Sequence, residues 1–183
     1  AVSNHSKGKN IYYCFTPPRS LYDLKKSHLA SQTTSGRLRH ILYNAFYQPL
    51  YENAIRKMDV ILADSKNVQN RLQKFLDLES TVIYPPCDID KFCWTGQEDY
   101  YLSTARLTPH KRVDIIIQAF IKLPQKHLII TSTGPDEKKL KQLAEGFDNI
   151  EFTGDINDKE LKNLIGNAIA TIYIPIDEDF GMS

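Results

Sequence analysis

The sequence predicts an α/β fold built from parallel β-sheets, and three observations support this prediction. Short apolar runs rich in β-branched and aromatic residues alternate with stretches of helical periodicity along the 183 residues. Most of these runs are continuously apolar rather than alternating, which is typical of strands covered on both faces. The alternation of strand and helix is dense enough to favour right-handed βαβ connections.

The expected elements follow this alternation in chain order. The strands are expected at residues 10–15, 59–63, 81–84, 100–104, 127–132, 149–153 and 168–174. The helices are expected between them, at residues 37–57, 67–76, 114–123, 135–145 and 158–167.

Several helix signals are local. Ser65 is placed to cap the helix at 67–76, and Pro135 suits the first position of the helix at 135–145. Asn157 followed by Glu160 has the spacing of a capping box, with Asn in place of Ser or Thr. Pro49 is expected to bend the long helix at 37–57.

Composition and charge exclude several classes of protein. Hydrophobic residues make up 42% and charged residues 25%, which is typical of a globular chain. Lys and Arg number 23 against 22 acidic residues, so there is no basic field for nucleic acid. The apolar runs are too short to span a membrane, and residues 1–10 lack the apolar region of a secretory signal.

The cysteines give no sign of a metal site. Cys14, Cys87 and Cys93 are too few and too widely spaced for a ligand motif, and the histidines are scattered. This usage fits a reducing compartment, so we expect a cytoplasmic protein without a bound metal.

The chain is expected to contain two α/β units. Residues 85–99 begin with Pro-Pro, are dense in turn residues and lack helical periodicity, which favours a linker. The units would then be residues 1–84 and 100–183. We expect both domains to be incomplete, because the first lacks a glycine-rich opening turn and the second stops soon after a strand.

Cations follow the strand expected at 100–104. Ligands of open parallel sheets bind at the carboxyl ends of the strands, so the residues after each strand matter most. Arg106 and Lys111 lie there, just before a helix whose free N–H groups attract anions. This arrangement suits a phosphate group, although a solvated charge cluster is an open alternative.

Glycines and carboxylates follow the later strands. Gly134 and Gly154 each come at a strand end, where a close backbone approach to a ligand and a plain turn are both open. Residues 177–179 are acidic and could accept hydrogen bonds from sugar hydroxyls, or form an acidic surface loop. Together, the strand ends favour a sugar phosphate or a nucleotide sugar as the ligand.

Five segments of the chain together form a specific pattern. They are VILADSKNVQNRLQKF, STVIYPPCDIDKF, YYLSTARLTPHKRVDIIIQAF, NIEFTGDINDKELKNLI and ATIYIPIDEDFG. In this order and at this spacing, residues 59–183 resemble the retaining glycosyltransferases of group 1, or family 4, which have two facing Rossmann-like domains, the GT-B fold. The earlier segment YYCFTPPRSLYD looks like a segment of mannosyltransferases of surface polysaccharide synthesis.

The resemblance implies roles for individual residues. Arg106 and Lys111 would hold the donor pyrophosphate, and Glu178 would be the first glutamate of the family's paired-glutamate motif, in contact with the donor sugar. These three are the implied catalytic residues. The donor site would also include Gly154, Ile156, Phe180, Gly181 and Met182. No metal or cofactor is implied, because protein cations stabilise the leaving nucleoside diphosphate.

The implied reaction transfers a hexose, with mannose favoured, to a glycan or lipid-linked acceptor with retention of configuration. GDP-mannose is favoured over UDP-glucose as donor. Residues 1–84 would end the acceptor-side domain and residues 100–183 would begin the donor domain. The family's second glutamate would fall beyond Ser183, so we expect an internal piece of a larger enzyme that is inactive alone.

Other readings of the sequence stay open. One is a non-catalytic nucleotide-sugar-binding fragment, and another is a different GT-B enzyme, either a sugar-nucleotide epimerase or a phosphorylase. Phe15 stands where the family has a histidine, so no acceptor role is assigned to Arg19. Lys25, Lys26 and residues 37–39 could attach the full enzyme to the inner face of the cell membrane, although a solvated helix face is favoured.

Overall fold

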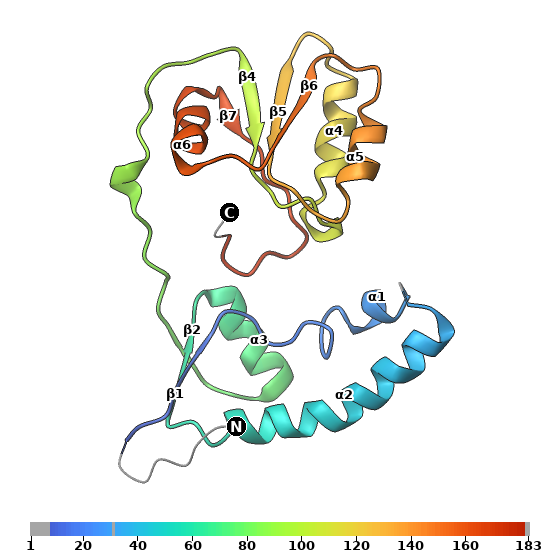
Figure 1. The fold of residues 1–183 in the computed structure, drawn as a ribbon. Helices are drawn as coiled ribbons and strands as arrows, with labels where there is room; N and C mark the ends of the chain where they lie inside the picture. Colours follow the sequence, from blue (N-terminus) through green and yellow to red (C-terminus); the bar gives the residue numbers. More distant parts are fainter. Residues whose placement is uncertain (1–7, 31, 182–183) are drawn as a thin grey trace. The chain divides into compact units, whose positions relative to one another are not determined.

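The computed structural model describes residues 8–30 and 32–181. The chain divides into two compact units, which we call unit 1 (Ala1–Pro86 with Asp179–Gly181) and unit 2 (from Cys87 to Glu178) (Figure 1). Every strand pair among the described residues is parallel. This confirms the predicted α/β class. The assignment of the units to an acceptor and a donor side stays a prediction.

Unit 1 contains a three-stranded sheet with the order β1-β2-β3. Its strands are β1 (Ile11–Cys14), β2 (Val60–Ala63) and β3 (Thr81–Val82), and its helices are α1 (Lys25–Ala30), α2 (Thr34–Ile55) and α3 (Lys66–Leu76). Ser65 caps α3 as predicted, because its Oγ accepts a hydrogen bond from the Val68 backbone N–H at 3.1 Å. Its core consists of Cys14, Ile55, Ala63, Val68, Leu72 and Leu76.

Helix α2 joins this core only at its C-terminal end. Ile55 belongs to the core cluster, and Tyr51 packs against it. The rest of the helix extends away from the sheet beside α1, and it continues through Pro49 (Figure 1). α2 begins at a Thr33 cap, whose Oγ1 accepts from the Gly36 N–H at 3.3 Å. α1 has no counterpart among the predicted helices.

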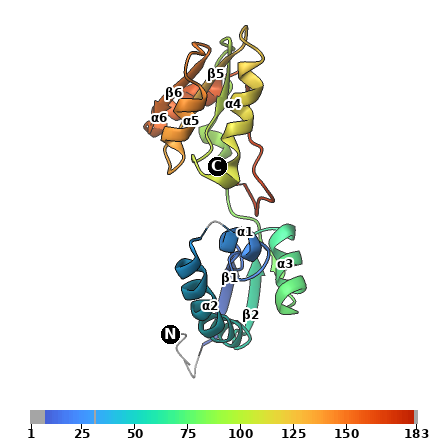
Figure 2. The same cartoon turned by 90° about the vertical axis from the view of Figure 1, so that its right-hand side faces the viewer.

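Unit 2 contains a four-stranded sheet with the order β6-β5-β4-β7. Its strands are β4 (Tyr100–Ser103), β5 (His127–Thr131), β6 (Ile150–Gly154) and β7 (Ala170–Thr171). Its helices are α4 (Val113–Ile121), α5 (Glu137–Leu143) and α6 (Asp158–Asn167), with short 3₁₀ turns η1 (Ile89–Lys91) and η2 (Pro109–Lys111). α4 and α5 lie on one face of the sheet and α6 lies on the other (Figures 1 and 2).

The strands of unit 2 alternate between two cores. Leu128 and Ile130 of β5 pack with the apolar residues of α4 and α5. Ile129, between them in sequence, packs with Tyr100 and Leu102 of β4 in the smaller cluster next to α6. This alternation shows why the strands are continuously apolar, since each side chain is buried on one face or the other.

Two details of the predicted elements are wrong. β7 spans two residues rather than residues 168–174, and Pro135 lies before α5 rather than at its first position. Pro135 lies outside the helix because residues 134–137 form a turn. In this turn the Glu137 N–H donates to Gly134 O at 3.1 Å, and the Asp136 N–H donates to Leu107 O at 3.1 Å.

The predicted capping box of α6 is confirmed. The Asn157 side chain accepts from the backbone N–H groups of Lys159 and Glu160, both at 3.0 Å. The Glu160 carboxylate accepts from the Asn157 N–H at 3.3 Å. Local sequence alone therefore sets where this helix begins.

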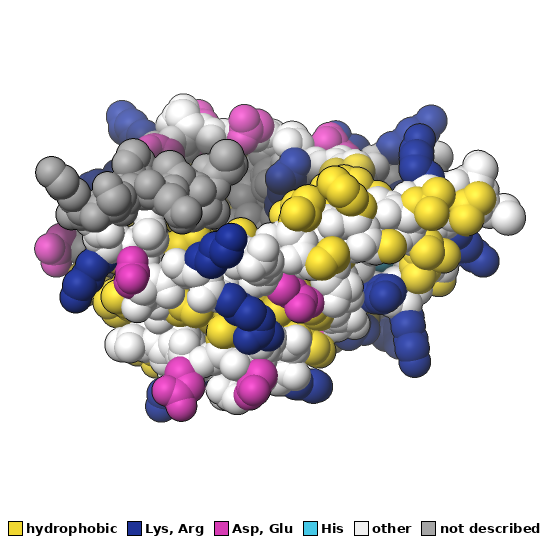
Figure 3. Space-filling view, turned by 90° about the horizontal axis from the view of Figure 1, so that it is seen from below, with side chains coloured by type: hydrophobic (Ala, Val, Ile, Leu, Met, Phe, Trp, Pro, Cys, Tyr) yellow, Lys and Arg dark blue, Asp and Glu magenta, His cyan; other side chains and the backbone are white. Residues whose placement is uncertain are grey.

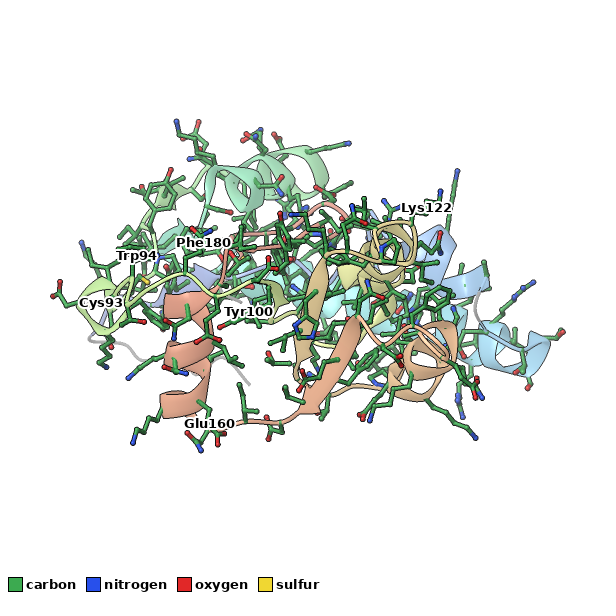
Figure 4. The ribbon with its side chains drawn as sticks, turned by 90° about the horizontal axis from the view of Figure 1, so that it is seen from above. Cys93, Trp94, Tyr100, Lys122, Glu160 and Phe180 are labelled. Atoms are coloured by element: carbon green, nitrogen blue, oxygen red, sulfur yellow. The ribbon has the colours of Figure 1, made fainter. Side chains whose placement is uncertain are left out.

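Residues 93–98 are held against α6. Thr95 N–H donates to Gly166 O at 3.0 Å, and Glu98 N–H donates to Asn167 O at 2.8 Å. A Cβ on Gly166 would lie 2.6 Å from the backbone oxygen of Cys93, so only glycine fits. Cys93 and Trp94 accordingly lie beside α6, whereas Lys122 lies at the end of α4 across the sheet (Figure 4).

Gly134 is required by packing within unit 2. A Cβ at this position would lie 2.3 Å from Leu107 O and 2.7 Å from its carbonyl carbon. The loop after β5 is thus pressed against the backbone that follows β4. Gly134 therefore permits a close approach of its backbone to the backbone of Leu107.

Substitution of Gly134 by alanine should destabilise unit 2 by about 3 kcal/mol, because the clash is with backbone that cannot rotate away. Gly146→Ala is the control, since Gly146 has open space and a φ of +84°, and it should cost only about 1–2 kcal/mol from backbone conformation. Hydrogen exchange of the β4 and β5 amides measures unit 2 specifically. Equal losses in the two variants would contradict the packing account.

Candidate functional site

The strand order of unit 2 places its candidate site. From β4 the chain moves to β5 and β6 on one side, and β7 then pairs with β4 on the other side. The order therefore reverses between β4 and β7. In open parallel sheets, ligands bind at such a reversal, outside the carboxyl ends of the two strands.

Three side chains meet at this reversal. Lys111 lies in η2 after β4, and Tyr173 and Glu178 follow β7. The Lys111 Nζ donates to Glu178 Oε2 at 2.7 Å and also to the Tyr173 hydroxyl. The Tyr173 hydroxyl donates to the same carboxylate oxygen at 2.5 Å. We call these three residues the Lys111 cluster. The structure thus brings together two of the predicted catalytic residues.

The Lys111 cluster keeps its lysine charged. Partial burial lowers the pKa of Lys111, but the hydrogen bonds to Glu178 and Tyr173 outweigh it, so the pKa is raised above its ordinary value. Because the folded-state pKa is the higher one, the stabilisation by this pair is complete below the ordinary pKa. It is lost only as the pH rises through the raised value. At neutral pH the cluster therefore presents a fixed ammonium group.

Backbone hydrogen bonds join the loops that follow the strands of unit 2. Leu107 N–H donates to Thr133 O at 3.1 Å, and Ser132 N–H donates to Gly154 O at 2.8 Å. Ile176 N–H donates to His110 O at 2.9 Å. The loops after β4, β5, β6 and β7 are therefore linked in a continuous series, which holds the carboxyl edge of the sheet in one arrangement.

The other predicted donor-site residues of unit 2 lie along this edge. Arg106 is exposed, and its guanidinium makes no hydrogen bond or ion pair within the described part of the chain. Gly154 ends β6 with a φ of +73°, and Ile156 is half-buried in the loop after it. These residues share the edge with the Lys111 cluster but make no hydrogen bond to it.

Phe180 and Gly181 belong to unit 1 by their contacts. The Phe180 ring stacks on Tyr84 with a centroid distance of 5.9 Å and an interplanar angle of 29°. Met182, the remaining predicted donor-site residue, lies outside the described residues. The role of all three residues at a donor stays a prediction.

Unit 1 contains a charged network around Arg71, in the middle of α3. Arg71 is buried and forms ion pairs with Asp179 and, at 3.6 Å, with Asp23. Ser65 Oγ donates to the backbone oxygen of Asp179 at 2.7 Å. Arg19 in turn pairs with Asp23 at 2.9 Å. Ser65 therefore both caps α3 and holds the Asp179 backbone.

Asp64 is a buried carboxyl next to this network. Its exposed fraction is 1%, and burial raises its pKa, although the polar side chain of Ser65 and the charge of Arg71 oppose the shift. It follows β2 directly, so it lies at the carboxyl edge of the sheet in unit 1. The sequence motif ADS contained this residue, but only the structure shows that it is buried.

Two surface hollows of unit 2 lie away from the Lys111 cluster. One lies at the start of α6, beside Lys91, Lys159 and Lys162, and the other lies along α5, beside Lys138 and Lys141. Both are shallow and lined by flexible lysines, so the strand-order reversal is the better candidate. Within residues 8–30 and 32–181, no three His, Cys, Asp or Glu side chains are grouped to hold a metal.

Comparison with known proteins identifies the family. Residues 88–183 match the family described as Glycosyl transferases group 1. The chain belongs to this family. The matched region contains the whole Lys111 cluster together with Arg106, Gly154 and Ile156.

A curated relative of this group 1 chain is the O-antigen chain mannosyltransferase RfbU of Salmonella typhimurium (strain LT2). The two are 28% identical over 170 residues, which cover 84% of this chain. They cover 48% of the relative, so the chain spans about half of its length.

Solved structures confirm the GT-B type of fold. WaaG, a glycosyltransferase involved in lipopolysaccharide biosynthesis, matches 92% of this chain and 50% of its own, with a TM-score of 0.65 at 17% identity. Anabaena Alr3699/HepE, solved with UDP and glucose, matches 91% of this chain and 46% of its own, with a TM-score of 0.63 at 16% identity.

Replacement of Glu178 by glutamine should lower the pKa of Lys111, because the carboxylate that stabilises the ammonium is lost while the burial remains. Tyr173→Phe should lower it less. Glu137→Gln, which removes the carboxylate partner of Lys141 on α5, is the control and should leave the Lys111 pKa unchanged. An NMR titration of labelled lysine side chains measures all of these. An unchanged Lys111 pKa in Glu178→Gln would show that the cluster does not form.

Proposed function

We propose that this chain supplies the donor-binding part of a glycosyltransferase that transfers a hexose from a nucleoside diphosphate sugar with retention of configuration. The observation that carries the proposal is the Lys111 cluster at the strand-order reversal. It combines a cation for phosphate with a carboxylate for sugar hydroxyls at the edge where ligands of parallel sheets bind.

Lys111 has the remaining capacity to bind a phosphate. An ammonium group has three N–H donors, and Glu178 and Tyr173 accept two of them. The third is available for a phosphate oxygen. Arg106, exposed on the same edge, adds a guanidinium that can grip a phosphate with two parallel hydrogen bonds.

These two cations would assist departure of the nucleoside diphosphate. As the glycosidic bond to the phosphate oxygen breaks, negative charge grows on the diphosphate. Charges fixed in advance stabilise the transition state more than the ground state, without reorganisation at the moment of reaction. The hydrogen bonds that join the post-strand loops keep Lys111 in this fixed position.

Glu178 would serve the sugar rather than the phosphate. Its Oε2 accepts hydrogen bonds from Lys111 and Tyr173, and a carboxylate, which has about four lone-pair sites, can accept a further one from a sugar hydroxyl. The neighbouring ammonium offsets the negative charge of the carboxylate, so Glu178 would not repel the diphosphate.

The favoured sugar is mannose, and GDP-mannose is favoured over UDP-glucose as donor. The mannosyltransferase relative from Salmonella supports this choice. The solved structures whose titles include UDP keep a uridine nucleotide as the alternative. We propose a glycan or lipid-linked acceptor, received by unit 1 as the acceptor-side unit, in a protein that works in the cytoplasm.

Calorimetric titration with GDP, UDP, GDP-mannose and UDP-glucose tests the donor site. Arg106→Ala and Lys111→Ala should each weaken binding of the preferred ligand by about 10–100-fold, from the loss of one hydrogen-bonded charge contact. In a protein that turns over, each should lower kcat by about 10²–10³-fold. Lys122→Ala is the control, because Lys122 is an exposed cation at the opposite end of α4.

Ligand binding that is equal in the native chain and in both variants would contradict the roles of Arg106 and Lys111. Selective binding without transfer to any acceptor would favour the non-catalytic reading. Selective binding together with conversion of the sugar nucleotide into its epimer would favour an epimerase.

A further inference from the structure

Arg112 is an unusual residue for the position that it occupies. It joins η2 to α4, and its backbone is left-handed, with a φ of 52° and a ψ of 37°. Its N–H donates to Pro109 O at 3.3 Å, which closes the turn between the two helices in this conformation. Glycine adopts a left-handed backbone without steric cost, whereas a long side chain adopts it with a loss of stability.

The other non-glycine residues with positive φ in the described part of the chain are short and polar. They are Asp77, Ser132 and Asp177, with φ of 52°, 91° and 49°. Short polar side chains can hydrogen-bond to nearby backbone, which offsets part of the steric cost. Arg112 has no such compensation, because its exposed guanidinium makes no hydrogen bond or ion pair with any residue that the structure describes.

The start of α4 is also an unfavourable place for a cation. The free N–H groups of a helix and the positive end of its dipole lie at its N-terminus. A capping side chain at this point accepts hydrogen bonds, but a guanidinium only donates, and Arg112 forms no cap bond. Backbone conformation, capping and charge therefore all disfavour arginine here. Residues that conflict with local preferences in this way are expected at functional sites.

Packing within unit 2 does not account for the arginine. Lys and Arg side chains project from many points of the surface (Figure 3), yet Arg112 is the one described cation whose backbone has a positive φ. The helix that it begins is a core helix, with Val113 and Ile116 buried. No helix in the described part of the chain is long and apolar enough to cross a bilayer.

The charges around Lys111 leave room for a further cation. The Lys111 ammonium lies 2.7 Å from the Glu178 carboxylate, so this pair has almost no net charge. Arg106 adds one positive charge, whereas each of the two phosphate groups of a nucleoside diphosphate carries at least one negative charge. The loop from β4 to α4, residues 104–112, contains no Asp or Glu, and Arg112 is its remaining Lys or Arg.

We propose that Arg112 binds the diphosphate of the donor together with Arg106 and Lys111, which rests on the proposed function and adds a third cation to its site. A bound phosphate would accept hydrogen bonds from the guanidinium and lie near the free N–H groups at the start of α4. The unfavourable charge and the missing cap of the ligand-free chain would then become favourable contacts. Arginine would therefore stabilise the complex while it destabilises the free chain.

Two neutral variants separate binding from stability. Arg112→Gly and Arg112→Asn remove the cation and supply residues that accept the left-handed backbone. In calorimetric titration with GDP and UDP, each should bind the preferred nucleotide about tenfold more weakly, from the loss of one charged hydrogen bond. Hydrogen exchange of the β4 and α4 amides should slow by roughly fivefold in both variants, because the backbone cost is relieved.

The conservative variant and the salt dependence identify the role of the charge. Arg112→Lys keeps the cation and should retain most of the affinity. Raising the salt concentration should weaken nucleotide binding in the native chain and in Arg112→Lys more than in the two neutral variants, because salt screens charge contacts. A merely structural role of Arg112 would leave the salt dependence the same in all four proteins.

Matched controls lie in unit 1 and at the other end of α4. Asp77→Gly changes an exposed residue with the same φ of 52° at the end of α3, and Lys122→Gln removes an exposed cation. Both should bind the nucleotide like the native chain. Arg106→Ala tests the proposed function itself and should bind about 10–100-fold more weakly.

The outcomes distinguish the role of Arg112 from the proposed function. Weaker binding in Arg106→Ala, with native affinity in both neutral Arg112 variants, would overturn the role of Arg112 alone. A loss of affinity together with faster exchange of the β4 and α4 amides would also overturn it, because the loss would then be structural. A folded native chain that binds neither GDP nor UDP would overturn both.

Discussion

Parallel strand pairing determines where the functional residues of this chain lie. Because the four strands of the unit 2 sheet run in one direction, every loop that follows a strand emerges at the same edge. Backbone hydrogen bonds then connect these loops in series, from Leu107 to Thr133 and from Ser132 to Gly154. Residues as far apart in sequence as Lys111 and Glu178 therefore meet without any local signal that would place them together.

Contacts at the same edge also hold the loop that carries Arg106 and Lys111 in place. Gly134 allows the loop after β5 to touch the Leu107 backbone, so the loop carrying Arg106 is held from one side. The bond from Ile176 to His110 holds η2 from the other side. Lys111, between these two attachments, is oriented before any ligand arrives, as transition-state stabilisation by a fixed charge requires.

Most of the fold could be predicted because periodicity is a local property. The strands expected at 100–104, 127–132 and 149–153 agree with β4, β5 and β6 to within about a residue at each end. Helix α1 could not be predicted, since it has only six residues and Arg37 of α2 satisfies its last carbonyls. Tyr173 was missed for another reason. It lay inside the strand expected at 168–174 and looked like a core residue, whereas β7 ends at Thr171 and frees Tyr173 to join Lys111 and Glu178.

We propose that the carboxyl edge of the unit 2 sheet forms a nucleoside diphosphate site around Lys111. Amide chemical shifts of the isotope-labelled chain, followed during titration with GDP, would locate such a site. We expect the shifts to concentrate at residues 106–111, 132–134, 154–156 and 173–178. Shifts concentrated at residues 122–127 and 146–149, on the opposite edge, would contradict it, as would a folded chain in which no amide responds to GDP or UDP.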